Sequence, residues 1–401
     1  MFEFTGFIFW RYDQKNSINL KKLNIKILGS GPTGSLLALA LANNNCTVTL
    51  EDPLEDHFIK LRDKAYAITH SSRRILNKLD LWNEISKQAK GFSSLALIDA
   101  VNNNYLLFNK DDLLAINSTQ NNVGWVIEHT HLMDIILNRI RNNSNIKRII
   151  STDIYIQNDN YDYIFAADGK DSSTRKLWNI NYFKRFYNQD CISFKVLLRT
   201  DYPYRAYEIL REDGPLALLP LKENIYQIIW FAPKLINSQR INYSKSHLLD
   251  VLASFLPDNI QPDIILSDIY RYPVTQSFII PDFRLSNKIL LGDSAHSFHP
   301  VGGQGLNSCW RDVYEINNMI EGINNKSYIV YNFSFRFYLK RFLDIFSLIV
   351  FTDLIIKTFS NNHFLINPFK KLVFKILSSS KYIKKRTLSL MTDSLSNFGL
   401  Y

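Results

Sequence analysis

The feature that most constrains this chain is a glycine-rich turn, GSGPTG at residues 29–34, set between two segments of different character. Before it lies the short β-branched run Asn24–Leu28, and after it lies an apolar stretch of small residues, 35–42, which we expect to be helical. A second β-branched run, 46–50, follows and leads into Glu51. This order of strand, turn, helix and strand predicts a βαβ unit with parallel strands and a right-handed crossover.

The turn fits the G-x-G-x-x-G pattern of dinucleotide-binding sites. The first glycine permits the tight turn, the second leaves room for a pyrophosphate against the backbone, and the third lets the helix pack closely on the strand. Unpaired N–H groups at the helix start then face the phosphate charge. A carboxylate roughly twenty residues further on can bind a ribose hydroxyl. The pattern does not separate FAD from NAD, and an ordinary βα turn with a solvated acid remains the alternative. The residues concerned are Gly29, Ser30, Gly31, Pro32, Thr33, Gly34 and Glu51.

Two further glycine–aspartate segments follow apolar strands. Residues 168–175 (DGKDSSTR) come after the strand expected at 161–167, and by themselves they also fit a type I turn and a capped helix start. In residues 292–307 (GDSAHSFHPVGGQGLN), the aspartate can meet a polyol chain. The glycines there expose N–H groups at a helix start, which stabilises an anion such as reduced flavin. His296 and His299 lack further ligands, so no metal site is expected.

The composition is that of a globular protein. A length of 401 residues suggests two or three domains of about 150 residues, and 46% apolar residues suffice for a substantial core. The charge of +10 accompanies lysine and asparagine enrichment along the whole chain, so we expect no nucleic-acid partner. Three scattered cysteines without a C-x-x-C pattern indicate a reducing, cytoplasmic compartment. No run of roughly 18 uncharged apolar residues predicts a membrane-spanning helix.

Hydrophobic periodicity predicts most of the remaining elements. Helices are expected at 66–90, 129–141 and 306–320, and the region after 327 is largely helical, aromatic and basic. Short alternating segments separated by proline and glycine turns predict an antiparallel sheet between 191 and 274. Further strands are expected at 95–98, 105–108 and 289–291.

With these motifs in place, the chain resembles the ubiquinone-biosynthesis hydroxylases (the UbiH, UbiF and VisC group), which are flavin monooxygenases with the p-hydroxybenzoate hydroxylase fold. The resemblance spans residues 24–330. A weaker match is KAYAITHSSRRIL at 64–76. Four segments carry the resemblance: GSGPTG at 29–34, AADGKDSSTR at 166–175, GPLALLPL at 214–221 and GDSAHSFHPVGGQGLN at 292–307.

The resemblance implies an α/β fold in which a Rossmann-like FAD-binding domain is interleaved with an antiparallel-sheet substrate domain, followed by a helical C-terminal region. The implied boundaries are an extension at 1–22, an FAD-binding domain at 23–92, 124–186 and 276–325, a substrate domain at 93–123 and 187–275, and the helical region at 326–401.

The resemblance also implies roles for individual residues. The glycine turn and Glu51 hold the ADP half of FAD, Asp293 binds its ribityl or pyrophosphate region, and Asp168 with Gly169 touches FAD and is linked to NAD(P)H use. The family usually has arginine in place of Lys64, and lysine keeps the charge but loses the bidentate fork. Pro300 is also expected to bind the cofactor. Along the pyrimidine edge of the flavin we expect Gly303, Gln304, Gly305, Leu306 and Asn307.

The implied activity is FAD-dependent monooxygenation, in which NAD(P)H and O2 are used to hydroxylate an aromatic quinone precursor. The substrate is then an aromatic small molecule, polyprenylated in many relatives. The basic, apolar C-terminal region either lies on an anionic membrane surface or packs on the body with solvated lysines, so we expect a cytoplasmic protein with peripheral membrane contact. Two alternatives stay open: an isoprenoid reductase of the same fold, and a non-catalytic degenerate flavoprotein. The catalytic base is not identified, and His299 is only a weak candidate.

Overall fold

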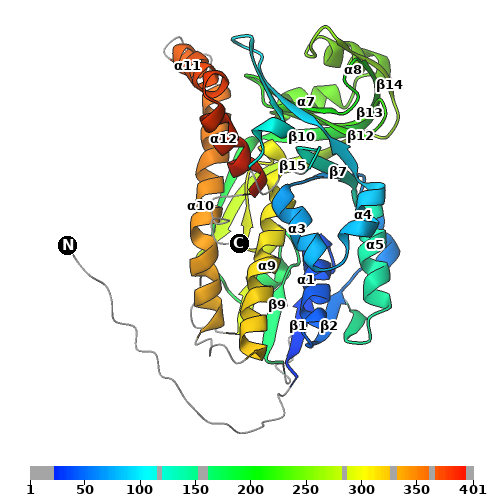
Figure 1. Cartoon of the computed structure of the whole chain (residues 1–401). Coiled ribbons are helices and arrows are strands. Elements are labelled where there is room, and N and C mark those ends of the chain that lie inside the picture. Colours follow the sequence, from blue (N-terminus) through cyan, green and yellow to red (C-terminus); the bar gives the residue numbers. More distant parts are fainter. Residues whose placement is uncertain are drawn as a thin grey trace, which may run out of the picture.

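The structure is a computed structural model of the chain that describes residues 22–114, 120–151, 161–281, 287–325, 332–360 and 366–393. The extension expected at 1–22 lies outside these residues apart from its last one. The described chain forms a five-stranded, a nine-stranded and a three-stranded sheet. Figure 1 shows the first two towards opposite ends of the molecule, with the long helices α9 (Gln304–Asn324) and α10 (Phe333–Phe359) running alongside.

The five-stranded sheet is parallel and contains the predicted βαβ unit. Its strand order is β16-β9-β1-β2-β8, and every neighbouring pair is parallel. Helix α1 (Pro32–Asn43) is buried along most of its length and contacts both α9 and α5 (His129–Arg141). The predicted unit is therefore confirmed, whereas edge strand β8 was not anticipated. The strands are β1 (Asn24–Leu28), β2 (Thr47–Asp52), β8 (Ile146–Ile150), β9 (Tyr163–Ala166) and β16 (Lys288–Leu290).

The nine-stranded sheet has the order β17-β15-β10-β13-β12-β11-β5-β6, and β14 pairs with β10. Its pairs are antiparallel except for β5 with β11, so the antiparallel sheet predicted for this part of the chain is confirmed. Helices α7 (Lys234–Arg240) and α8 (Lys245–Ala253) interrupt the strands and were not predicted. The strands are β5 (Ser94–Asp99), β6 (Asn104–Asn109), β10 (Tyr182–Thr200), β11 (Arg205–Leu210), β12 (Leu216–Lys222), β13 (Ile225–Pro233), β14 (Ile260–Ile265), β15 (Tyr270–Ile279) and β17 (His296–Ser297).

The smallest sheet packs against β12 of the nine-stranded sheet. It pairs β7 (Gly124–Glu128) with β3 (Ala65–Ile68) and β4 (Lys90–Phe92). The helical stretch expected at 66–90 begins as strand β3 and then forms two helices, because Asp80 adopts a left-handed conformation (φ 56°) between them. The accompanying helices are α2 (Asp56–Lys60), α3 (His70–Lys78), α4 (Trp82–Gln88) and α5 (His129–Arg141), and the last has the predicted bounds.

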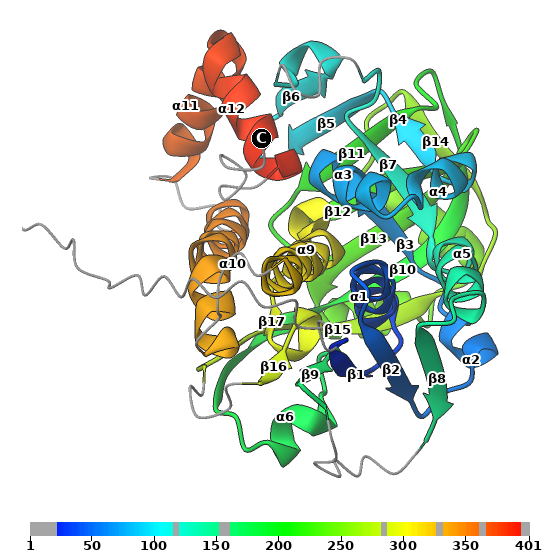
Figure 2. The ribbon, with the colours of Figure 1, turned by 60° about the horizontal axis from the view of Figure 1, so that its bottom comes forward.

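The C-terminal region is helical in its described parts, as predicted. Helices α11 (Ile366–Ser379) and α12 (Lys381–Asp393) follow α10 and lie beside β5 and β6 (Figure 2). Among the described helices, none combines the length and the apolar character needed to cross a membrane. Short helices α6 (Ser173–Leu177), η1 (Lys110–Asp112), η3 (Gly292–Ser294) and η4 (Val301–Gly303) lie in the connecting turns.

Candidate functional site

The glycine-rich turn lies at the carboxyl edge of the parallel sheet, in contact with the two other glycine–aspartate turns. A Cβ atom on Gly29, which has φ of 99°, would lie 2.5 Å from the carbonyl oxygen of Ala167. A Cβ on Gly34 would lie 1.9 Å from the carbonyl oxygen of Gly29. A Cβ on Gly292 would lie 3.1 Å from Thr33 Cγ2. Three segments far apart in the sequence therefore meet at one place.

At two other positions, contacts within the chain do not explain why the residue is glycine. A Cβ on Gly31 or on Gly305 would have no described atom within 4 Å, and neither residue has a positive φ. Gly31 stands at the start of α1, and Gly305 lies in the first turn of α9. The space outside both helix starts is open, as the phosphates and the ring edge of FAD require. On this test the residues present fit the cofactor.

The acids expected near FAD lie at neighbouring strand ends. The Asp293 side chain is exposed, and its Oδ1 lies 3.7 Å from Cys309 Sγ. Asp168 Oδ2 accepts a hydrogen bond from the Thr174 backbone N–H at 2.9 Å, which caps α6, while its buried Oδ1 has no described partner. Gly169 has φ of 85°, which accounts for a glycine there. Because β16 and β9 are adjacent and parallel, both acids lie at the same edge of the sheet.

The two acids that end β2 have different surroundings. The Glu51 carboxylate pairs with Lys26 Nζ at 2.7 Å, and both side chains are buried. Asp52 Oδ2 accepts a hydrogen bond from the backbone N–H of Ser30 at 2.7 Å, so Asp52 lies at the glycine turn itself. Successive strand residues point to opposite faces, and the sequence pattern alone did not single out Asp52.

Lys64 lies in a region of mixed charge beside these turns. Its ammonium is 4.1 Å from the centre of the Tyr272 ring. Burial, and then the nearby Arg62, lower the pKa of Lys64, whereas Asp293 opposes them and Lys170 acts with Arg62. Arg62 and Lys170 therefore both lie within electrostatic range of Lys64.

A buried ionic network holds the 292–294 turn against α9 and α10. Asp312 accepts hydrogen bonds from the Gly292 backbone N–H at 2.8 Å and from Arg341 at 2.7 Å, and its carboxylate lies 2.7 Å from His296 Nε2. Arg341 also pairs with Asp344 at 2.5 Å. Burial by itself raises the pKa of Asp312, but His296 and Arg341 outweigh it and hold the pKa at about 2.

The start of α9 is tied to the β3–α3 connection by one side chain. Asn307 Nδ2 donates to the carbonyl oxygen of Ala67 at 2.8 Å, and its Oδ1 accepts from Ser72 Oγ at 2.6 Å and from the Thr69 N–H at 3.1 Å. The Asn307 amide is therefore used within the chain, and it fixes the backbone that the sequence places at the flavin edge.

The other residues expected at this edge differ in their surroundings. Gly303 has φ of 63°, and a Cβ there would lie 3.2 Å from Ala67 Cβ. Leu306 packs against the core beneath the parallel sheet, and Pro300 is exposed. Gln304 Nε2 donates to the carbonyl oxygens of Gly302 at 3.2 Å and Met391 at 2.7 Å, which ties the turn to α12.

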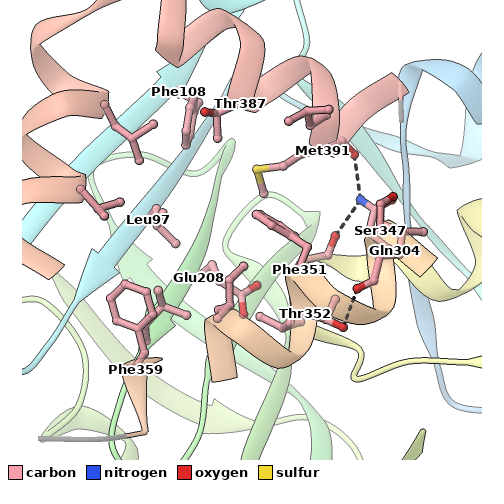
Figure 3. A pocket seen from close by; sticks show the side chains of 18 of the residues that line it. Leu97, Phe108, Glu208, Gln304, Ser347, Phe351, Thr352, Phe359, Thr387 and Met391 are labelled. Atoms are coloured by element: carbon pink, nitrogen blue, oxygen red, sulfur yellow. Dashed lines mark hydrogen bonds between the residues drawn. The ribbon is translucent and has the colours of Figure 1, made fainter. Parts of the chain in front are cut away.

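A cavity of about 320 Å³ adjoins this turn (Figure 3). Its walls are strands β5, β6 and β11, the η4 turn and the three C-terminal helices. The lining is almost entirely apolar, and no basic side chain is among the described residues that line it. Two carboxyl groups line it, and one of them, Asp344, is paired with Arg311 and Arg341.

The second carboxyl group, Glu208 on β11, is only 9% exposed. The Gly302 backbone N–H donates a hydrogen bond to it, while Oε1 has no described partner. Burial raises the pKa of Glu208 to about 7, and the Gly302 hydrogen bond opposes the shift. The sequence analysis missed this residue, although a lone acid in the strand AYEIL at 206–210 was a signal for it.

His299, the weak catalytic candidate, is fully buried and does not line the cavity. Its ring lies 4.8 Å from that of Phe231 and 5.2 Å from that of Tyr187, and Nε2 is 3.3 Å from Gln189 Oε1. Burial lowers the pKa of His299 to about 3, so the imidazole is neutral at ordinary pH. Among the described residues, no group of three histidine, cysteine or acidic side chains is placed to hold a metal ion.

Comparison with known proteins agrees with this geometry. Residues 159–321 match a family model described as an FAD binding domain. The chain is 28% identical over 203 residues to 3-demethoxyubiquinol 3-hydroxylase of Escherichia coli, a match covering 50% of this chain and 51% of that protein. It is 21% identical to the ubiquinone biosynthesis monooxygenase COQ6 of Dictyostelium discoideum, covering 90% and 89% of the two chains.

Among solved structures, p-nitrophenol 4-monooxygenase PnpA from Pseudomonas putida superposes with a TM-score of 0.73 at 16% identity, over 92% of this chain and 96% of that chain. This likeness shows the fold. Fold, converging turns and family model together define an FAD-dependent monooxygenase of the p-hydroxybenzoate hydroxylase type. Within that class, the relatives to which the chain is similar include several ubiquinone-biosynthesis hydroxylases and monooxygenases.

Proposed function

We propose that this protein hydroxylates the aromatic ring of a quinone precursor, using NAD(P)H and O2, in ubiquinone-type quinone biosynthesis. The observation that carries the proposal is the apolar cavity beside the η4 turn, since an aromatic ring bound there lies next to the expected flavin edge. Bound FAD supplies the redox chemistry, by passing electrons from NAD(P)H to O2 so that one oxygen atom reaches the ring. The chain binds and orients the ring and excludes water.

The residues expected from the sequence remain our proposal for the FAD site, and Asp52 is added to them because its carboxylate lies at the glycine turn. Gly31 and Gly305 leave open space, and Asp293 and Asp168 lie at the same edge of the parallel sheet. In the same proposal, the segments 23–92, 124–186 and 276–325 form the FAD-binding domain, 93–123 and 187–275 form the substrate domain, and 326–401 forms the helical region.

We also propose that the ring carries an isoprenoid tail and is taken from a membrane surface. The C-terminal helices that roof the cavity expose large apolar side chains, among them Leu343 of α10 and Leu372 of α11. Lysines 371 and 375 lie on the exposed surface of α11. An apolar surface flanked by lysines favours peripheral contact with anionic lipid.

The test uses the purified full chain. We expect the protein to carry FAD and, with NAD(P)H and a short-chain prenylated phenol, to form a product that contains one oxygen atom from isotopically labelled O2, as read by mass spectrometry. Saturation of a prenyl double bond without oxygen incorporation would support the isoprenoid reductase instead. A chain that cannot be reconstituted with FAD would support the non-catalytic flavoprotein.

A further inference from the structure

The cavity contains polar atoms that the chain itself does not satisfy. Glu208 Oε1 is buried and has no described hydrogen-bond partner. Gln304 Oε1, which is also buried, has none either, because both N–H groups of that amide face carbonyl oxygens of the chain. Both side chains line the same cavity (Figure 3). An unmet buried acceptor costs free energy, so such atoms call for an explanation.

The position of Glu208 follows from the pleat of β11. Tyr207 and Ile209 belong to the core on one face of the sheet, whereas Glu208 and Leu210 line the cavity on the other. The Gly302 N–H that binds the carboxyl belongs to η4, the turn that leads into α9. Glu208 therefore connects the cavity wall directly to the expected flavin edge.

The unsatisfied atoms are acceptors, so they fit a ligand that donates a hydrogen bond. A phenolic hydroxyl is such a donor, whereas a methyl ether or a quinone carbonyl is not. The lining also disfavours an anionic ligand, because no basic side chain among the described lining residues would balance a carboxylate on the ring. The chemistry of the cavity thus selects a neutral phenol with an apolar body.

Building on the proposed function, we propose that Glu208 binds the hydroxyl group of a neutral, non-carboxylated phenol, and that the Glu208 carboxylate takes up its proton as the ring reacts. The O–H electron pair stays on the phenol oxygen, which makes the ring carbons more electron-rich. One atom of O2 forms the new C–O bond as a hydroxyl group and the other leaves as water, while NAD(P)H supplies the two electrons and solvent supplies the one further proton that the balance requires. The attacked carbon then loses its hydrogen as a proton, and the proton on Glu208 returns to the phenol oxygen.

The experiment measures equilibrium binding to the FAD-loaded full chain without NAD(P)H, so that no turnover occurs. The ligands are 2-geranylphenol, its methyl ether, and the same phenol carrying a ring carboxylate. We expect the wild-type protein to prefer the phenol over the ether by about tenfold to a hundredfold, as for a hydrogen bond to a charged group. The carboxylated phenol should bind more weakly than the neutral one.

Three variants test whether Glu208 is the residue that causes the preference for the phenol over the ether. Glu208→Leu should abolish it, and Glu208→Gln, which keeps an acceptor but no titration, should weaken it and make it independent of pH. In the wild type the phenol preference should fade as the pH drops below about 7, because the carboxylate is then protonated. The matched control is Glu212→Gln, an exposed acid just beyond the same strand, which should behave as wild type.

The outcomes separate this inference from the proposed function. A protein without FAD or without oxygen transfer contradicts the function. An FAD-loaded protein that binds phenol and ether equally, or whose preference survives in both Glu208 variants, overturns the inference alone. A phenol preference that strengthens at low pH would mean that the hydroxyl binds protonated Glu208 better than the carboxylate, and would also overturn it. If Glu208→Leu fails to fold, Glu208→Gln tests the inference instead, because its preference for the phenol over the ether should not change with pH.

Discussion

The two sides of the site are built in different ways. On the cofactor side, backbone atoms of distant turns touch one another, and single polar side chains such as Asn307 and Asp312 hold them in place. On the cavity side, apolar side chains from a sheet and three helices surround Glu208, an acid whose Oε1 atom has no described hydrogen-bond partner. The cofactor side therefore tolerates little change in geometry, whereas the cavity side can exchange apolar side chains and keeps its specificity in few polar atoms.

Removal of Asp312 should have the largest effect, because it breaks a buried network on the cofactor side. Asp312→Ala leaves Arg341 and His296 without their shared carboxylate, and should cost about 3–5 kcal/mol of unfolding free energy, measured by denaturant titration. The control is Glu315→Gln on the same helix, which removes a more exposed pair with Lys340 and should cost about 1 kcal/mol or less.

The lowered pKa of Asp312 also determines how its contribution to stability changes with pH. The pKa of Asp312 is held at about 2, below its usual value of 3.8, so the stability it contributes is present above the usual value and is lost as pH falls towards 2. Equal losses in Asp312→Ala and Glu315→Gln would mean that the cofactor side is no more dependent on its polar contacts than the surface is.

Two glycines in one turn should separate folding from cofactor binding. In Gly34→Ala the new Cβ meets the carbonyl oxygen of Gly29 at 1.9 Å, so unfolding should become easier by about 1–3 kcal/mol. In Gly31→Ala the new Cβ meets no described atom, so the FAD-free protein should keep its melting temperature while FAD binds about tenfold more weakly. Thermal melts measure the stability of the two variants, and fluorescence titration measures their affinity for FAD. If the two variants change in the same way, the two glycines do not have separate roles in folding and in cofactor binding.

The cofactor side and the cavity side also differ in how much of each could be predicted from the sequence. The turn at 29–34 requires particular residues for local backbone reasons, so the βαβ unit could be predicted from the residues, whereas its convergence with Gly292 was expected only from the family resemblance. Glu51 and Asp52 are adjacent acids, and only the strand pleat and the Lys26 pairing distinguish them. Glu208 becomes conspicuous only when β11 meets the C-terminal helices, a long-range contact that no local pattern contains.

Glu208 should lower the stability of the folded protein, although it contributes to binding of the phenol. Its pKa is raised by burial to about 7, so the folded form disfavours the carboxylate, and stability falls as pH rises from the usual value of 4.5 through 7. Glu208→Gln should therefore stabilise the protein by about 1–2 kcal/mol at pH near 8 and change little near pH 5. Thermal melts at the two pH values measure this, and destabilisation at both would show that the acid is structural.

The smallest expected effect concerns the outer surface of the cavity side. Replacing Lys371 and Lys375 of α11 by glutamate removes two cations from the exposed face beside Leu372, and each lysine near an anionic bilayer is worth about 1 kcal/mol. Sedimentation with vesicles containing anionic lipid should show about fivefold weaker binding for each replacement, and added salt should reduce the difference. Lys87→Glu on α4, an exposed lysine on another part of the surface, is the control. Equal loss in the control would mean that net charge, and not the helical roof of the cavity, directs the protein to lipid.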